Sequence, residues 1–222
     1  MDIVTKGVDV LFCIDLFLAK IRLFFIYLYY SLIGMKDIIL FLINKTFKLL
    51  KYSEVYLQRG KFFSNPQSSI HSSFKLGADN VLDIHPKAVF NIAENVMINQ
   101  NNFITVKKEA QLSIGKETYI TRATISCLEE ITIGENCILG EGLKIFDHNH
   151  SYTKEPFSVS KAEFNTAPIK IGNNVWTGAN CIILKGVTIG DNVILGAGCT
   201  IYKDIPANSI VINKQELMVK SV

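Results

Sequence analysis

The most regular feature of the hydrophobic pattern is a period of six residues in the last third of the chain. From Ile171 the sequence divides into IGNNVW, TGANCI, ILKGVT, IGDNVI, LGAGCT and IYKDIP. The first position is aliphatic or Thr, and the fifth is Val, Cys or Ile. Neither an amphipathic helix nor a simple alternating strand has this period. A fixed period of this kind predicts a solenoid built from repeated units.

Each block of six is expected to form a short strand and a turn, so that three blocks close one triangular coil. First-position side chains then point inward and stack on their counterparts in the next coil, about 4.8 Å away. Fifth-position side chains lie at the corners, where Val, Cys and Thr fit the limited space. Gly, Asn and Asp near the corners tolerate the positive φ of a tight turn.

The period continues upstream with less regularity. It passes through Ile92, Ile98, Ile104, Ile114, Ile120, Ile133, Leu139 and Ile145. One additional residue falls in 126–130, where we predict a small bulge, and Asn102 fits a fifth position poorly. We predict a repeat domain over 92–212, an irregular lead-in with the first coils over 52–91, and a tail over 213–222. No register is predicted before Ile92.

Residues 1–51 have a different composition, crowded with Leu, Ile, Phe and Tyr and punctuated by basic residues. Leu23 to Met35 is the longest charge-free run here, shorter than the ~20 residues that a spanning helix needs. The segment lacks the pattern of a cleavable signal peptide. It predicts helices that either lie in a membrane interface or pack on protein, and these alternatives weigh about equally. A spanning helix ranks third, and the helices are also candidates to cap one end of the solenoid.

The six-residue period stops at 147–168, and this break contains two of the chain's four histidines. A solenoid can extrude a loop at a corner without disturbing its neighbouring coils. The loop is polar, and Phe157 and Phe164 are its expected anchors. A neutral imidazole of His148 or His150 at the root of such a loop is able to take a proton from an attacking hydroxyl. Asp147 is expected to anchor the loop, with even odds of touching an active site.

The repeats resemble those of the hexapeptide-repeat acyltransferases, which fold as left-handed parallel β-helices. The segment PIKIGNNVWTGANCIILKGVTIGDNVILGAGCTIYKDIPANSIV is similar to the maltose, galactoside and surface-polysaccharide O-acetyltransferases. The fold class is therefore mainly β: a left-handed parallel β-helix with an N-terminal apolar helical segment. The resemblance implies a homotrimer with active sites between subunits, and acetyl-CoA (coenzyme A) as the acyl donor.

The resemblance also implies roles for individual residues. His148 is the expected general base, with His150 in reserve. Trp176, Asp147 and Arg122 are expected to line the acceptor side of the active site. The residues expected to bind coenzyme A are Gly178, Ala179, Ala197, Lys203 and, with a weaker match, Lys185. Two departures are the stretch YITRATIS, where the family has an acceptor-binding asparagine, and the ending VINKQELMVKSV.

The function expected from these features is O-acetylation of a sugar hydroxyl on a surface glycan or glycolipid precursor. The enzyme would act in the cytoplasm, peripherally on the inner face of the plasma membrane, through residues 1–51. Alternatives are N-acylation of an amino sugar, acetylation of a xenobiotic or of serine, and a non-catalytic β-helix scaffold. A test of which acceptors are acetylated separates the three enzymatic functions from one another.

Charge, cysteine content and histidine spacing argue against three other classes of protein: nucleic-acid-binding, disulfide-bonded and zinc-binding proteins. A net charge of +3 over 222 residues, without a basic stripe, argues against a nucleic-acid partner. Five cysteines without paired spacing give no disulfide framework and favour a reducing compartment. Two histidines close together without a third ligand do not make a zinc site, so no metal is expected. His71 and His85 lie outside the clear repeat and have no assigned role.

Overall fold

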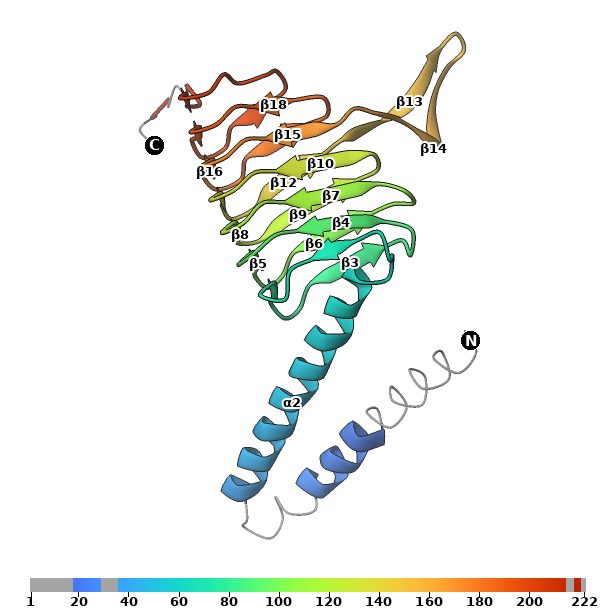
Figure 1. Cartoon of the computed structure of the whole chain (residues 1–222). Coiled ribbons are helices and arrows are strands. Elements are labelled where there is room, and N and C mark those ends of the chain that lie inside the picture. Colours follow the sequence, from blue (N-terminus) through green and yellow to red (C-terminus); the bar gives the residue numbers. More distant parts are fainter. Residues whose placement is uncertain (1–17, 29–35, 215–217, 221–222) are drawn as a thin grey trace. The chain divides into compact units, whose positions relative to one another are not determined.

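The computed structural model describes residues 18–28, 36–214 and 218–220. They form two compact units, which divide after Glu54. The first unit holds a helix over 18–28 and about the first two thirds of α2 (Lys36–Phe62). The second holds the last turns of α2 and a parallel β-solenoid (Figure 1).

Three parallel sheets form the sides of the solenoid, and each successive strand in a sheet comes from the next coil. Sheet A contains β1 (Ser69–Ile70), β4 (Val89–Ile92), β7 (Gln111–Ile114), β10 (Glu130–Ile133), β15 (Ile169–Ile171) and β18 (Thr188–Ile189). Sheet B contains β2 (Lys75–Leu76), β5 (Met97–Ile98), β8 (Tyr119–Ile120), β11 (Ile138–Leu139), β16 (Trp176–Thr177), β19 (Ile194–Leu195) and β21 (Ile210–Val211). Sheet C contains β3 (Val81–Ile84), β6 (Phe103–Val106), β9 (Ala123–Cys127), β12 (Leu143–Phe146), β17 (Ile182–Leu184) and β20 (Thr200–Ile201).

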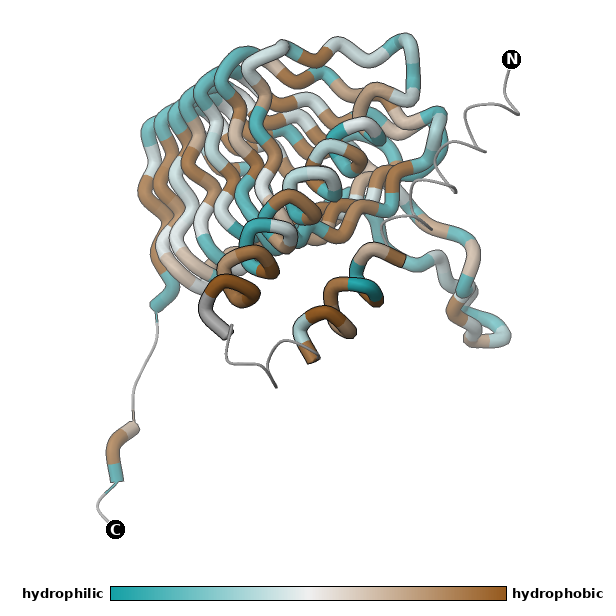
Figure 2. Tube along the Cα trace, turned by 90° about the horizontal axis from the view of Figure 1, so that it is seen from below, coloured by the Kyte–Doolittle hydropathy of each residue, from teal (hydrophilic) through white to brown (hydrophobic). Residues whose placement is uncertain are grey.

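The predicted inward columns are confirmed, and they make up the core. Equivalent positions pair in register from coil to coil, as Ile145 does with Ile125 and Ile183. Hydrophobic and hydrophilic positions therefore form rows that run along the solenoid (Figure 2). The column inside sheet C is Leu82, Ile104, Ile125, Ile145, Ile183 and Ile201, with none more than 7% exposed.

The corners adopt the left-handed backbone conformation that the turn residues predicted. Among the described residues, ten non-glycine residues have φ between 53° and 63°, most of them asparagines, whose short polar side chain tolerates this region. They are Asp79, Asn95, Asn101, Glu109, Glu117, Asn136, Asn174, Asn180, Asn192 and Asn208.

The solenoid begins earlier than its six-residue period. Residues 52–91 contain the last turns of α2, all of the first coil and the first strand of the second. Phe62, at the end of α2, is fully buried, with ring centroids 5.4 Å from Phe74 and 4.8 Å from Phe90. The last turn of α2 therefore packs on the first coil; it lies in 52–91, where an irregular lead-in was expected, and not in the 1–51 segment that was the candidate cap.

The early coils are wider than the late ones, which explains the missing register. From sheet C to sheet A, Ile104 and Ile114 lie ten positions apart, whereas Ile183 and Ile189 lie six apart. The extra length adds further inward side chains, such as Val106 and Ala110. The prediction of a single-residue bulge at 126–130 is wrong. The difference in residue number from the six-residue repeat is spread over two sides of the coil and is not one insertion at a corner.

Candidate active site

A β-hairpin leaves the solenoid where sheet C turns toward sheet A in the fourth coil. Its strands are β13 (His148–Lys154) and β14 (Phe157–Thr166), which pair antiparallel and project from the stack of coils (Figure 1). The predicted break at 147–168 thus coincides with the hairpin, which is regular rather than an open loop. Phe157 is 75% exposed, so its expected role as an anchor is wrong.

Asp147 stands at the root of the hairpin and is completely buried. Its carboxylate accepts hydrogen bonds from the backbone N–H groups of Leu128 at 2.9 Å, Glu129 at 2.8 Å and Glu130 at 3.1 Å. Three consecutive N–H groups form a concave site that suits an anion. Asp147 therefore ties the corner of the third coil to the point where the hairpin begins.

His148 makes a hydrogen bond to the same carboxylate. Its Nδ1 lies 3.0 Å from Oδ1 of Asp147, and its side chain is 15% exposed. Because a carboxylate accepts, Nδ1 carries the proton, and the lone pair of the neutral ring is at Nε2. The ring of Phe164 contacts the imidazole edge-on, with centroids 5.2 Å apart. The imidazole is thus oriented by a charge on one side and an aromatic ring on another.

His150 is also oriented through Nδ1, but by a backbone group. Nδ1 lies 2.9 Å from the carbonyl oxygen of Ser160, so Nδ1 is again the donor and Nε2 the basic nitrogen. The ring lies 4.7 Å from the ring of Phe164. His150 is more exposed than His148, and its Nδ1 is bonded to a backbone carbonyl where that of His148 is bonded to a carboxylate, so the two histidines differ in access and in electrostatic support.

Cys127 lies beside this cluster as a buried thiol. Burial raises the pKa of Cys127, and the nearby charge of Asp147 raises it further. Burial likewise raises the pKa of Cys137 and Cys181. These thiols therefore remain neutral and are unsuited to act as nucleophiles near neutral pH.

Lys185 and Lys203 occupy equivalent corner positions in the next two coils. Phe146 pairs with Leu184, so Lys185 follows sheet C as Asp147 does, and Lys203 holds the same place one coil further on. Nζ of Lys185 hydrogen-bonds to Oδ1 of Asn165 in β14, which joins the fifth coil to the base of the hairpin. The structure therefore brings both lysines to the corner that carries His148.

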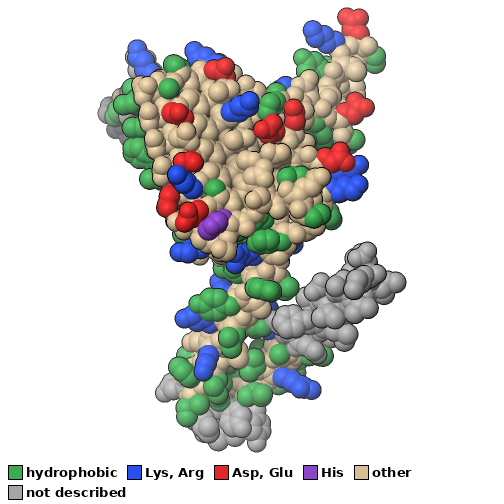
Figure 3. Space-filling view, viewed as in Figure 1, with side chains coloured by type: hydrophobic (Ala, Val, Ile, Leu, Met, Phe, Trp, Pro, Cys, Tyr) green, Lys and Arg blue, Asp and Glu red, His purple; other side chains and the backbone are tan. Residues whose placement is uncertain are grey.

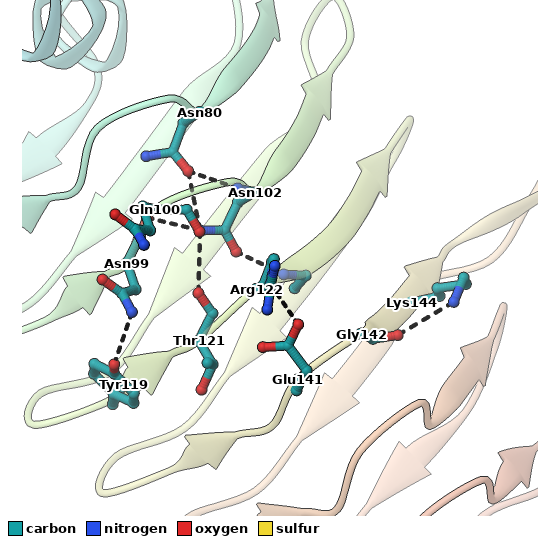
Figure 4. Close-up of polar contacts among 11 residues, drawn as sticks. Asn80, Asn99, Gln100, Asn102, Tyr119, Thr121, Arg122, Glu141, Gly142 and Lys144 are labelled. Atoms are coloured by element: carbon teal, nitrogen blue, oxygen red, sulfur yellow. Dashed lines mark hydrogen bonds and ion pairs between the residues drawn. The ribbon is translucent and has the colours of Figure 1, made fainter.

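The remaining predicted residues lie elsewhere on the coils. Arg122 lies at the opposite edge of sheet C, where it forms an ion pair with Glu141 (Figure 4). Trp176 is on sheet B and 51% exposed, as expected for a side chain that projects from the solenoid. Within one chain, sheet C separates Arg122 from His148.

The small residues predicted for donor binding also lie at the edge between sheets B and C. A Cβ added to Gly178 would lie 2.6 Å from the backbone nitrogen of Ala197, so glycine is required there for the coils to stack. The carbonyl of Ala179 accepts a hydrogen bond from N–H of Gly198 at 2.8 Å. The geometry gives Gly178 a structural role whether or not a ligand binds nearby.

Sequence reasoning missed several residues that build this region. Phe164 was expected only as an anchor, yet it contacts both histidines. Ser160 and Asn165 had no signal in the sequence, because their contacts depend on the register of the hairpin. Within the described ranges, no group of three or more His, Cys, Asp or Glu side chains converges on a point that could hold a metal ion.

Comparisons with known proteins agree with the repeat. The family described as "Bacterial transferase hexapeptide (six repeats)" matches residues 168–203. The chain is 38% identical over 102 residues to Nodulation protein L of Rhizobium meliloti (strain 1021), covering 46% of this chain and 55% of that protein. The chain spans about half the length of the curated relatives it matches.

Solved structures similar to this chain include two acetyltransferases. A galactoside acetyltransferase in complex with coenzyme A is 26% identical, with TM-score 0.42, covering 71% of this chain and 75% of that one. A hexapeptide-repeat acetyltransferase of Vibrio cholerae O1 biovar eltor, complexed with acetyl coenzyme A, is 21% identical, with TM-score 0.44, covering 70% and 68%. The matched residues 168–203 lie within the parallel coils, so this part of the chain is a hexapeptide repeat folded as a parallel β-solenoid.

Proposed function

We propose that this protein is an acetyl-CoA-dependent O-acetyltransferase that modifies a sugar hydroxyl of a surface glycan or glycolipid precursor. The observation that carries the proposal is the oriented imidazole at the root of the hairpin. Asp147 holds Nδ1 of His148, which directs its basic Nε2 away from the carboxylate. A buried carboxylate in this position also stabilises the imidazolium that forms when the ring accepts a proton.

The proposed reaction is a direct transfer. Nε2 of His148 removes the proton from the acceptor hydroxyl as the sugar oxygen attacks the thioester carbonyl. The tetrahedral intermediate collapses as the C–S bond breaks, and the coenzyme A thiolate takes the proton from the imidazolium. An acetyl ester and free coenzyme A are the products. A buried neutral thiol such as Cys127 is a poor nucleophile, which supports transfer without an acyl-enzyme.

His150 is the alternative base, because its Nδ1 is also engaged and its ring is more accessible. The carboxylate partner favours His148, while exposure favours His150. Substitution of each residue separately decides between them. In either case the base belongs to the hairpin, and Phe164 fixes both rings.

Coenzyme A is proposed to bind along the coils that follow the hairpin. Lys185 and Lys203 place two positive charges at the corner of His148, where they are able to meet phosphate groups. Gly178, Ala179 and Ala197, at the opposite edge of sheet C, leave the backbone open to a long pantetheine arm. These two groups of residues do not meet within one chain, so the donor site requires a neighbouring copy.

A homotrimer would supply that copy. An outward apolar column runs along sheet B, where Ile138 pairs with Trp176 and Trp176 pairs with Ile194. Ile138 and Trp176 are each about half exposed, at 53% and 51%. Apolar side chains stacked over successive coils support a subunit contact at this face. In such a trimer, Trp176 and Arg122 of one copy would line the acceptor side of the active site.

The acceptor is proposed to be lipid-linked and met at the inner face of the plasma membrane. Residues 1–51 support this proposal through their apolar and basic composition. Within 1–51, the structure describes only residues 18–28 and 36–51. Among the helices that the structure does describe, none combines the length and apolarity needed to cross a membrane.

The test of the proposed function is thiol release from acetyl-CoA with a panel of sugars, amino sugars and serine. We expect turnover with a sugar and a product whose acetyl group is released by mild base, as an ester is. An exclusively base-stable amide product would contradict O-acetylation. Absence of thiol release with every acceptor, from protein that retains its coil structure, would favour the scaffold alternative.

A further inference from the structure

The part of α2 that belongs to the first unit has two faces, and the helix over 18–28 lies against one of them. Between the two helices lies an apolar space of about 250 Å³. It is lined by Lys20, Leu23, Phe24, Tyr27, Leu40, Ile43, Thr46, Phe47 and Leu50. The side of α2 that carries Ile43 and Leu50 therefore faces its companion helix. The opposite side of α2 is left for another contact.

That opposite side is a mixed aromatic and basic surface, which we call the outer face. It consists of Phe41, Lys45, Lys48, Leu49 and Tyr52, whose spacing places them on one side of a helix. Phe41 is 66% exposed, Leu49 60% and Tyr52 63%. These side chains, with Asn44, line a shallow hollow of about 490 Å³. Figure 3 shows hydrophobic and basic side chains interleaved along α2.

The composition of the outer face favours a lipid partner over a second copy of the chain. The centre of a protein interface is depleted in lysine, whereas here two lysines stand among the large apolar side chains. Two copies meeting at this face would bring Lys45 and Lys48 of each against those of the other. Aromatic rings flanked by lysines instead match the headgroup level of a bilayer with anionic lipid.

The geometry points to a surface-bound helix rather than a spanning one. Lys45 and Lys48 lie within the apolar stretch, and no described helix is able to cross a membrane. We propose that the outer face of α2 docks on anionic phospholipid, with Phe41, Leu49 and Tyr52 inserted among acyl chains and the lysines on lipid phosphates. This deepens the membrane location of the proposed function but does not depend on acetyl transfer.

The experiment is co-sedimentation of the full chain with vesicles of phosphatidylcholine alone or with added phosphatidylserine. Lys45→Gln with Lys48→Gln should weaken binding to the anionic vesicles by about 30-fold, at roughly 1 kcal/mol per lysine. Phe41→Ser with Leu49→Ser should weaken it by on the order of 100-fold, because two large apolar side chains no longer insert. Binding of the wild type should fall as salt is raised.

Matched controls lie on the solenoid. Lys75→Gln with Lys170→Gln removes two exposed lysines, and Val81→Ser with Phe103→Ser removes an exposed aliphatic and an exposed aromatic side chain. Neither pair should change vesicle binding.

Three results would overturn the proposal. One is equal binding to neutral and anionic vesicles, and another is no binding to either. The third is a change in assembly mass in sedimentation velocity for the Phe41 and Leu49 variant with vesicle binding intact, which would assign the face to a second copy. Thiol release with a water-soluble sugar should be unaffected by the outer-face variants, so failure of this proposal is distinguishable from failure of the proposed function.

Discussion

The early and late coils of the solenoid achieve the same stacking with different sequences. In the late coils, sides of six residues carry Ile, Leu, Val and Cys inward, and the period is visible by eye. In the early coils the side between sheets C and A is longer, and large residues such as Phe74, Phe90 and Leu112 fill the wider interior. Register between coils therefore depends on inward stacking, and a constant repeat length is only one way to obtain it.

The two regions also close their corners differently. In the first coil, N–H of Ala88 donates to the carbonyl of His85 at 2.9 Å, which is an ordinary turn. After the third coil, the corner at 128–130 donates its N–H groups to Asp147 of the following coil. A side chain from one coil thus replaces the local turn of another, at the place where the hairpin leaves.

The largest expected effect on stability comes from removing that side chain. Asp147→Ala leaves three backbone N–H groups without their acceptor, each costing about 1–3 kcal/mol, so we expect a loss of about 3–5 kcal/mol in the free energy of unfolding. Chemical denaturation measures it. The control is Asp83→Ala, which removes an exposed ion pair to Lys107 and should cost less than about 1 kcal/mol. An equal loss in the free energy of unfolding for the two variants would show that Asp147 does not stabilise the fold through its bonds to the corner at 128–130.

A second contrast concerns two residues that occupy equivalent corner positions in different coils. They are Asn102 in the second coil and Cys181 in the fifth. Asn102 is buried, accepts from N–H of Ala123 at 2.7 Å and donates to Asn80 at 3.0 Å (Figure 4). Asn102→Ala should cost about 3 kcal/mol because its partners lose their hydrogen bonds. Cys181→Ala should cost about 1 kcal/mol, since it removes one sulfur atom and a weak thiol hydrogen bond to the carbonyl oxygen of Gly196. A reversed order in thermal or chemical unfolding would contradict this comparison.

The buried thiols predict how stability depends on pH. The folded state raises the pKa of Cys127, Cys137 and Cys181 above the ordinary value of 9.0, so the folded protein holds protons that the unfolded chain releases. This contribution is complete below pH 9 and is lost as pH rises. Above that point, the free energy of unfolding should fall by at most about 1.4 kcal/mol per pH unit for each thiol that is still protonated in the folded protein and ionised in the unfolded chain. A Cys127→Ala variant should show a shallower slope, and an unchanged slope would exclude the thiol as its source.

The smallest expected effect is on the KM for acetyl-CoA, and it tests whether the late coils bind the acyl donor. Lys185→Ala and Lys203→Ala should each raise KM for acetyl-CoA about fivefold, the effect of roughly 1 kcal/mol from one solvent-accessible charge, with kcat little changed. Lys75→Ala, in the first coil, should leave KM unchanged. A similar rise for Lys75→Ala would indicate a general charge effect rather than a donor site at this corner.

The different lengths of the early and late coils decided how much of the fold could be predicted from the sequence. The columns from Ile171 onward were readable because each coil repeats the same length, and the φ of the corners followed from their asparagines. The first coil was not readable, because its sides are unequal and α2 runs into it through Phe62. Asn102 seemed misplaced in an apolar column, although the amide of Asn80 one coil below satisfies it.

The place of the hairpin in the sequence was predictable, but the contacts at its root were not. The interruption of the period located the hairpin, and His148, His150 and Asp147 were all named from it. The donation of three N–H groups to Asp147 was not predictable, because they come from a different coil. The separation of Arg122 from His148 by sheet C also depends on which corner each residue occupies, and no local pattern specifies that.

The central claim is that an imidazole held by Asp147 is the base for acetyl transfer, and kcat/KM of single histidine variants tests it most directly. His148→Ala should lower kcat/KM by about 10²–10⁴. His150→Ala should lower it less than about tenfold, and His85→Ala, at an ordinary corner of the first coil, should leave it unchanged. Loss of activity in His150→Ala with retention in His148→Ala, or equal activity in all three, would contradict the account.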